Sequence, residues 1–160
     1  MRVAIALGSN LGDREAHMRG AIAALGPVLS NLRVSSFYET EPVDMTGPQP
    51  MFLNGAATGE SLLSAPAVLD VLLALEQGFG RERPYMGAPR TIDLDLIVYG
   101  DSIIDVPGLI VPHPRFRERR FVLEPLVEIA PDWIDPVTGK TMRQLLGELA
   151  KPKSQIPRMT

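Results

Sequence analysis

Apolar and polar positions alternate along this chain with two different periods, which together predict a series of strands and helices. Short apolar runs rich in β-branched residues are typical of strands, whereas apolar residues three or four positions apart are typical of a helix face. The predicted strands cover residues 2–7, 32–40, 52–63 and 91–99. The predicted helices begin after Asp13, after Ser64, at Phe121 and after Thr141, where Gln144 completes a capping box.

The first two predicted helices each have an apolar stripe that would face a sheet. In the first helix the stripe consists of Leu11, Met18, Ile22 and Leu25. In the second helix it consists of Val68, Leu72, Leu75 and Phe79. Within the strand 52–63, Gly55 and Gly59 are predicted to mark bulges, because an isolated glycine in a strand pattern often does so.

The order of the elements is strand, helix, strand, strand, helix, strand, followed by additional elements. This order is that of the split βαβ arrangement in ferredoxin-like α+β folds. We therefore expect a ferredoxin-like βαββαβ core with a mostly antiparallel sheet, helices packed on one face, and added C-terminal elements. With 160 residues the chain is expected to form a single domain, residues 1–160, with a loose tail from Lys151.

Composition narrows the class of protein. Apolar residues make up 45% and charged residues 22%, as in ordinary soluble globular proteins. The net charge of −3 argues against general nucleic-acid binding, and the absence of cysteine excludes disulfides and thiolate metal sites. No apolar run is long enough to span a membrane, and the first is too short for a signal peptide. We therefore expect a cytoplasmic protein that binds neither nucleic acid nor membranes.

Two aspartates inside the predicted strand 91–99 need a chemical explanation. Asp93 and Asp95 lie among apolar residues and, being two positions apart, point to the same face, about 7 Å apart at Cα. Their repulsion would cost about 2 kcal/mol at an effective dielectric constant of ~20. A solvent-facing pair is one interpretation. A hard cation is the other, because Mg²⁺ takes one or two carboxylates and fills its remaining positions with water and phosphate oxygens.

Basic residues precede this strand. Arg81, Arg83 and Arg90 lie in a segment rich in glycine and proline. They could pair with Glu76 and Glu82 in a solvated loop, or they could clamp a polyphosphate, because a guanidinium fork fits two oxygens at once. Arginines and Mg²⁺-binding carboxylates in one segment indicate phosphoryl-type transfer.

His113 lies between two prolines and ahead of a basic run. A lone histidine is usually a packed or solvated side chain, but the flanking prolines fix the backbone and favour a histidine that is aimed at a site. The arginines that follow could form a solvated face, a nucleic-acid patch or a local anion site, and the net charge of −3 favours the anion site. These arginines are Arg115, Arg117, Arg119 and Arg120.

Several segments are distinctive in combination: GSNLGDR, SSFYETEPV, FLNGA, APRTIDLDLIVYG, VPHPRF and FVLEPLVEIAP. Together they resemble the hydroxymethyldihydropterin pyrophosphokinase family of the folate pathway, over residues 1 to about 149. The resemblance implies a ferredoxin-like fold and an enzyme that uses ATP and two Mg²⁺ ions. The implied reaction transfers the β,γ-pyrophosphoryl group of ATP to the hydroxymethyl oxygen of 6-hydroxymethyl-7,8-dihydropterin and releases AMP. We expect a monomer whose partners are these small-molecule substrates.

The motif positions carry the family's roles onto individual residues. The resemblance implies that Asp93 and Asp95 bind both Mg²⁺ ions and that Arg81 and Arg90 stabilise charge during transfer. The implied ATP-binding residues are Glu76, Arg81, Arg83, Arg90, His113 and Arg119. The implied pterin-binding residues are Thr40, Val43, Phe52, Asn54 and Phe121, with the two phenylalanines stacking on the ring. The loops 42–50 and 81–89 are expected to close over the bound substrates.

A non-catalytic binding module is the rival interpretation, since ferredoxin-like folds also host RNA-binding and regulatory domains. Asp93 and Asp95 distinguish the two, because an RNA-binding sheet would not place two carboxylates on its working face. The sequence therefore favours the enzyme.

Overall fold

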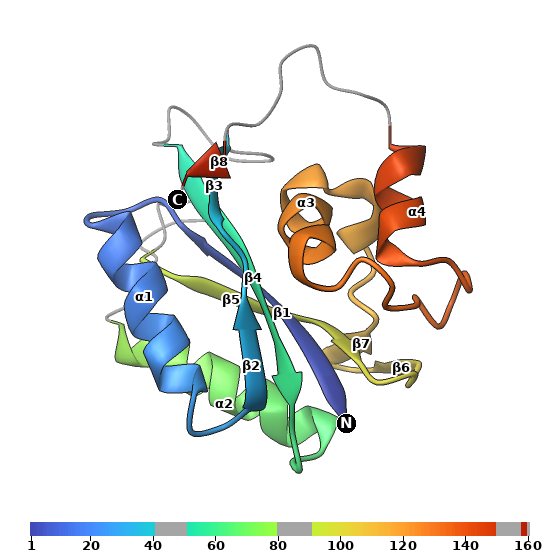
Figure 1. The fold of residues 1–160 in the computed structure, drawn as a ribbon. Helices are drawn as coiled ribbons and strands as arrows, with labels where there is room; N and C mark the ends of the chain where they lie inside the picture. Colours follow the sequence, from blue (N-terminus) through green and yellow to red (C-terminus); the bar gives the residue numbers. More distant parts are fainter. Residues whose placement is uncertain (41–50, 80–90, 150–157, 160) are drawn as a thin grey trace.

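The computed structural model describes residues 1–40, 51–79, 91–149 and 158–159 (Figure 1). The N-terminal half contains β1 (Arg2–Ser9), α1 (Arg14–Leu25), β2 (Ser30–Val34), β3 (Phe37–Thr40), β4 (Phe52–Glu60) and α2 (Ala65–Gly78). The C-terminal half contains β5 (Asp93–Tyr99), β6 (Ile104–Val106), β7 (Leu109–Val111), a 3₁₀ helix η1 (Phe116–Glu118), α3 (Arg120–Ile129), α4 (Met142–Glu148) and β8 (Arg158–Met159).

The main sheet has the strand order β5-β1-β4-β3-β8, and β2 also pairs with β4. All strand pairings among the described residues are antiparallel. The central strands β1 and β4 are therefore flanked by β5 on one side and by β2 and β3 on the other, which is the ferredoxin-like order. The predicted fold class is confirmed, and β5, which carries the two aspartates, forms one edge of the described sheet.

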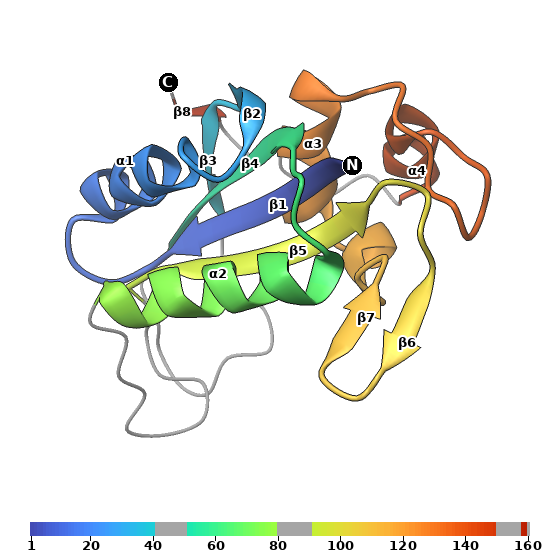
Figure 2. The ribbon, with the colours of Figure 1, turned by 90° about the horizontal axis from the view of Figure 1, so that it is seen from below.

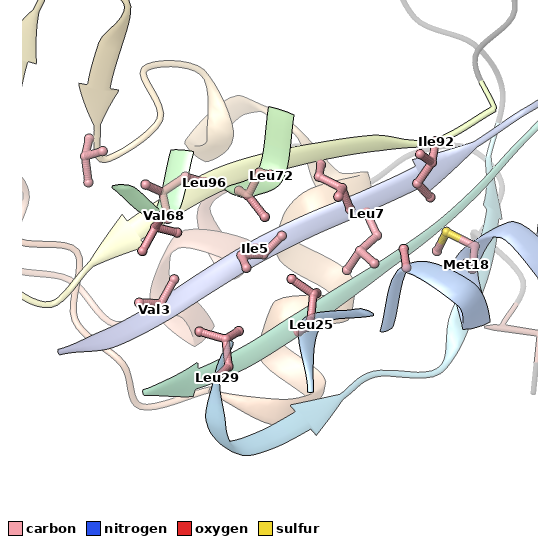
Figure 3. Close-up of a cluster of buried hydrophobic side chains, with 14 of the residues drawn as sticks. Val3, Ile5, Leu7, Met18, Leu25, Leu29, Val68, Leu72, Ile92 and Leu96 are labelled. Atoms are coloured by element: carbon pink, nitrogen blue, oxygen red, sulfur yellow. The ribbon is translucent and has the colours of Figure 1, made fainter. Parts of the chain in front are cut away.

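Helices α1 and α2 cover one face of the sheet, as expected. Alternate residues of β1, namely Val3, Ile5 and Leu7, pack there against Val68 and Leu72 of α2 (Figure 3). Full burial of side chains of this size contributes about 1.5–3 kcal/mol each. The predicted helix stripes hold with a single exception: Leu11 precedes α1 and is 42% exposed.

Helix α3 covers the opposite face, and α4 packs beside α3 (Figure 2). Small residues in the strands, Ala4, Ala6 and Ala56, leave room there for Leu123 and Leu126 of α3. The prediction of helices on one face is therefore confirmed for the core helices α1 and α2, and α3, one of the added C-terminal elements, packs on the other face. The reason is that α3 has its own apolar face, which must also be buried against a partner.

The predicted helix caps are confirmed. Asp13 Oδ1 accepts a hydrogen bond from the Ala16 amide (3.1 Å), and Ser64 Oγ accepts one from the Ala67 amide (3.3 Å). At α4, Thr141 Oγ1 accepts from the Gln144 amide (3.1 Å) while Gln144 Oε1 accepts from the Thr141 amide (2.8 Å). Each cap satisfies amides that the first helical turn leaves without an intrahelical acceptor.

The predicted strand 32–40 is broken into β2 and β3 at Ser35 and Ser36. Ser35 keeps the break attached to the sheet in two ways. Its amide donates to the Ala56 carbonyl oxygen (2.9 Å), and its hydroxyl accepts from the Ala56 amide (2.8 Å). A side-chain oxygen thus takes the place of a ladder carbonyl, and the chain can bend without leaving a buried amide unpaired.

The predicted bulges at Gly55 and Gly59 are wrong. The pairing of β4 with β1 runs through both positions without a register shift, and the irregularity opposite Gly59 belongs to β2. Close packing explains these glycines instead. A Cβ on Gly59 would lie 2.9 Å from the Leu29 Cβ, and one on Gly55 would lie 3.1 Å from a ring carbon of Phe37.

Two short features were not predicted. Strands β6 and β7 form a hairpin whose turn contains Gly108 at φ 83°, a conformation that favours glycine. In the tail, β8 pairs with Phe37 and Tyr38 of β3, which corrects the expectation of a loose segment for Arg158–Met159. The remaining tail, residues 150–157 and 160, lies outside the described residues.

Candidate active site

The register of β5 against β1 decides which way the two aspartates point. Asp93 pairs with Gly8 and Asp95 pairs with Ala6, whose side chain belongs to the α3 face of the sheet. The alternating residues Leu94 and Leu96 are buried on the α1–α2 face. Both carboxylates therefore lie on the α3 face, with Asp93 half-buried and Asp95 exposed. The predicted common orientation is confirmed.

Gly8 links this pair to the residues expected to bind pterin. On the other side of β1, Gly8 pairs with Asn54 of β4, while Thr40 of β3 pairs with Phe52. The Asn54 amide nitrogen donates to the Thr40 hydroxyl, and Thr40, Phe52 and Asn54 are all buried. A Cβ on Gly8 would lie 3.0 Å from Asn54 Oδ1, so the missing side chain gives Asn54 and Phe52 room above β1.

Phe121 approaches the same face from α3. It lies in the first turn of that helix, is half-buried, and packs against the cluster that contains Ala6 and Ala56. The guanidinium of Arg119 lies 5.6 Å from the centroid of the Phe121 ring, within the range of a cation–π contact. The structure thus brings the described pterin candidates and the aspartates onto one face of the sheet.

His113 is held at the edge of β5 by its own backbone, since its amide donates to the Ile97 carbonyl oxygen at 2.8 Å. Burial lowers the pKa of His113, Asp95 opposes this change, and the cations Arg119 and Arg115 lower the pKa further. Its Nδ1 accepts from the Arg115 amide at 3.2 Å. The neutral ring therefore carries its proton on Nε2, where it can donate to an anionic ligand.

A groove of about 430 Å³ runs along the open edge of β5, between α2 and the β6–β7 hairpin. Four polar side chains line it, and these are Glu76, Asp93, Asp95 and His113. The rest of the groove wall is apolar and includes Leu69, Leu73 and Leu109, together with Gly108, which has no side chain. The groove therefore combines carboxylates suited to a hard cation with a neutral histidine, across β1 from the pterin candidate Asn54.

Glu76 has a structural role that its sequence position did not indicate. It is only 5% exposed, and its Oε2 accepts a hydrogen bond of 2.8 Å from the Leu94 amide. Leu94 lies between Asp93 and Asp95. A buried carboxylate from α2 therefore holds the edge strand β5 between its two candidate metal ligands. The only sequence signal is a charged residue on the inner side of an amphipathic helix, beside Leu72.

Other predicted residues lie outside the described part of the chain: Val43, Arg81, Arg83 and Arg90, with the loops 42–50 and 81–89. Their roles stay predictions. Among the described residues, no group of three or more histidine, cysteine, aspartate or glutamate side chains could hold a metal ion by itself. None of the described helices is both long and apolar enough to cross a membrane.

Comparison with known proteins decides the family. Residues 4–131 match the family model described as 7,8-dihydro-6-hydroxymethylpterin-pyrophosphokinase (HPPK). The chain belongs to the HPPK family. It is therefore a pyrophosphokinase of folate biosynthesis, and the rival interpretation as a non-catalytic binding module is not supported.

Individual HPPK relatives agree with this assignment. The chain is 46% identical over 147 residues to 2-amino-4-hydroxy-6-hydroxymethyldihydropteridine pyrophosphokinase of Synechocystis sp., a match that covers 91% of this chain and 74% of the relative. It is 44% identical over 127 residues to the enzyme of the same name from Bacillus subtilis, covering 78% and 75% respectively.

Solved structures agree on the fold. An HPPK-DHPS triple mutant of Plasmodium falciparum, with STZ-DHP, aligns over 92% of this chain with a TM-score of 0.74 and 13% sequence identity. The chain spans 43% of that structure's length. At this identity the likeness supports the fold alone.

Proposed function

We propose that this HPPK transfers the β,γ-pyrophosphoryl group of ATP to the hydroxymethyl oxygen of 6-hydroxymethyl-7,8-dihydropterin on the α3 face of the sheet. The hydroxymethyl oxygen forms a bond to the β-phosphorus and loses its proton. The bond from that phosphorus to the oxygen bridging the α-phosphate breaks, and AMP departs. The observation that carries the proposal is the strand register, which places Asp93 and Asn54 on opposite sides of Gly8.

The donor set of the aspartates fits Mg²⁺. Asp93 and Asp95 are hard oxygen ligands on one face, and they are too few for an all-protein cage. Mg²⁺ commonly takes only one or two carboxylates and leaves its other positions to water and phosphate. When bound, two Mg²⁺ ions would neutralise triphosphate charge and polarise the phosphoryl oxygens. The role of Asp93 and Asp95 is to hold that charge at the reacting end of the groove.

The pterin candidates would position the acceptor. Phe52 and Phe121 offer flat apolar faces from β4 and α3, while the Asn54 amide and the Thr40 hydroxyl offer polar groups for the ring's edge. Asp93 and Asn54 are two strands apart, about 10 Å at Cα. A bicyclic pterin bound at Asn54 therefore reaches across Gly8 with its hydroxymethyl group directed towards Asp93. Positioning of this kind is the main contribution of a protein to phosphoryl transfer.

The nucleotide would lie along the groove at the edge of β5. His113 would donate from Nε2 to a phosphate oxygen, and Arg119 would add positive charge beside the Phe121 ring. Glu76 would act on ATP through the β5 backbone that it holds. Arg81, Arg83 and Arg90 are proposed to clamp the triphosphate, and Val43 to line the pterin pocket, on the resemblance alone. A cytoplasmic monomer remains our prediction.

Measuring AMP tests the proposal directly. The purified protein is incubated with ATP, 6-hydroxymethyl-7,8-dihydropterin and Mg²⁺, and AMP and the pterin diphosphate are separated and quantified. We expect the two products in equal amounts, and neither product when the pterin is omitted or when EDTA removes the metal. Formation of ADP in place of AMP, or AMP release without pterin, would contradict the proposed reaction.

A further inference from the structure

Two of the sequence motifs, SSFYETEPV and FVLEPLVEIAP, meet at a place outside the groove. Glu128, in the last turn of α3, accepts hydrogen bonds from β3 and the residue before it. Its carboxylate accepts from the Ser36 amide (2.9 Å to Oε2) and from the Ser36 hydroxyl (3.0 Å). It also accepts from the hydroxyl of Tyr38 at 2.7 Å. One carboxylate thus ties the C-terminal end of α3 to the strand that follows the break at Ser35.

The two elements that the Glu128 carboxylate joins, α3 and β3, both border the proposed pterin pocket. Glu128 and Phe121 are seven residues apart, which is two helical turns, so they lie on the same face of α3. On the sheet side, Tyr38 pairs directly with Asn54, and Thr40 pairs with Phe52. Side chains of directly paired residues lie about 4.5–5.5 Å apart at Cβ and on the same face of the sheet. The carboxylate therefore joins the helix that carries one pocket wall to the strands that carry the other.

We propose that Glu128 is a positioning residue that sets the separation of Phe121 from Phe52 and Asn54, and with it the affinity for the pterin ring. This inference rests on the proposed pterin site. Phe52 and Asn54 are already buried and held in the sheet, so the position of α3 is the adjustable element of the pocket. Hydrogen bonds to a charged acceptor are the stronger kind, and three donor groups from the described residues converge on this one. Tyr38 is 6% exposed, so its ring is fixed beside Asn54.

The aspartates and the groove depend on different contacts. Asp93 and Asp95 lie on β5, at the far edge of the sheet from β3, and are held through β1 and Glu76. Loosening the end of α3 should therefore change the affinity for pterin far more than that for ATP. If the Glu128 contact only stabilised the fold, its loss would lower the fraction of folded protein. The apparent affinities for pterin and for ATP would then weaken together.

The test compares Glu128→Ala, Glu128→Gln and Tyr38→Phe with the wild type. Dissociation constants are measured for the pterin in the presence of a non-hydrolysable ATP analogue and Mg²⁺, and separately for the analogue with Mg²⁺. Glu128→Ala should raise the pterin constant by about tenfold, the size expected for losing charge-assisted hydrogen bonds. The analogue constant should stay within about twofold, a shift too small to signal lost contacts. Glu128→Gln retains a carbonyl acceptor and should recover most of the pterin affinity.

Glu124→Ala is the matched control, because Glu124 lies on the same helix but pairs with Arg120 one turn away (2.7 Å). It should leave both constants unchanged. If Glu128→Ala does not fold, Tyr38→Phe provides the test, since it removes only the hydroxyl that donates at 2.7 Å. Parallel losses of pterin and analogue affinity, or unchanged pterin affinity in both Glu128→Ala and Tyr38→Phe, would overturn the inference. A wild-type protein that binds no pterin would instead refute the proposed function.

Discussion

The buried carboxylate of Glu76 accepts a hydrogen bond of 2.8 Å from the backbone amide of Leu94, the residue between Asp93 and Asp95. Because β5 is an edge strand of the described sheet, this amide has no neighbouring strand on its outer side. Helix α2 thus provides, through one side chain, the acceptor that a further strand would have supplied. The contact fixes the backbone of β5 at the point from which the side chains of Asp93 and Asp95, the proposed metal ligands, project.

Removing this acceptor should affect both stability and metal binding. Glu76→Ala is expected to destabilise the fold by about 1–3 kcal/mol, because the Leu94 amide loses its acceptor in a buried place. It should also weaken Mg²⁺-dependent nucleotide binding. Glu76→Gln keeps a carbonyl acceptor, so it should lose less stability and less nucleotide affinity than Glu76→Ala. Thermal unfolding and Mg²⁺ titration of nucleotide binding measure the two effects. Asp70→Ala, an exposed position on the same helix, serves as control, and equal effects at Asp70 and Glu76 would refute the assignment.

Neutralising either aspartate should separate activity from stability. Asp93→Asn and Asp95→Asn are each expected to lower the rate of AMP formation by several powers of ten, because each removes a proposed metal ligand. Without Mg²⁺ the melting temperature should stay the same or rise, since each change relieves repulsion between like charges. Asp105→Asn, at an exposed acid on β6, should alter neither quantity. Near-normal turnover in either variant would rule out the metal assignment.

Gly8→Ala should impair pterin binding selectively. The new Cβ would lie 3.0 Å from Asn54 Oδ1 and 3.5 Å from a ring carbon of Phe52, so Asn54 must shift by a few tenths of an ångström. We expect the pterin dissociation constant to rise about tenfold, comparable to the loss of one good polar contact. Calorimetry with pterin and the ATP analogue provides the measurement. Gly147→Ala on α4, where a Cβ meets nothing within 4 Å, should leave binding intact, and an equal effect there would refute the explanation.

Asp135 should make the protein less stable in acid. Burial by itself would raise the pKa of Asp135, but hydrogen bonds from Arg117, Thr138 and the Val137 amide outweigh it and hold the pKa below its ordinary value. The unfolded chain therefore takes up the proton first as pH falls. The stabilisation is complete above the unfolded pKa and disappears as pH falls through the lower, folded pKa.

Asp135→Asn tests this pH dependence, since the side chain is fully buried and paired with Arg117 at 2.9 Å. At neutral pH the variant should be less stable by about 3–5 kcal/mol, because Arg117 loses its partner. As pH falls below about 5 it should lose less stability than the wild type, as chemical denaturation at several pH values would reveal. Asp132→Asn, at an exposed neighbour, is the control. A parallel decline of Asp135→Asn and wild type in acid would exclude Asp135 as the titrating group.

Local features of the fold could be predicted because they depend on residues only a few positions apart. Asp13, Ser64 and Thr141 cap helices through amides three residues ahead, so their neighbours in sequence are also their neighbours in space. The common orientation of Asp93 and Asp95 follows in the same way from the two-residue period of a strand. The remaining site roles came from the resemblance of whole motifs, and those in residues 41–50 and 80–90 lie outside the described structure.

Contacts between distant segments were decided only by the tertiary structure. No local pattern could reveal that Gly8 separates Asp93 from Asn54, because strand register depends on how whole faces pack. Glu128 resembles an ordinary charged helix position in the sequence, and Glu76 differs only in lying on the inner side of its helix. Each nevertheless accepts a hydrogen bond from a strand. A carboxylate's partners are set by which backbone or hydroxyl donors the fold brings within about 3 Å of it. That proximity arises only when helix and sheet pack together.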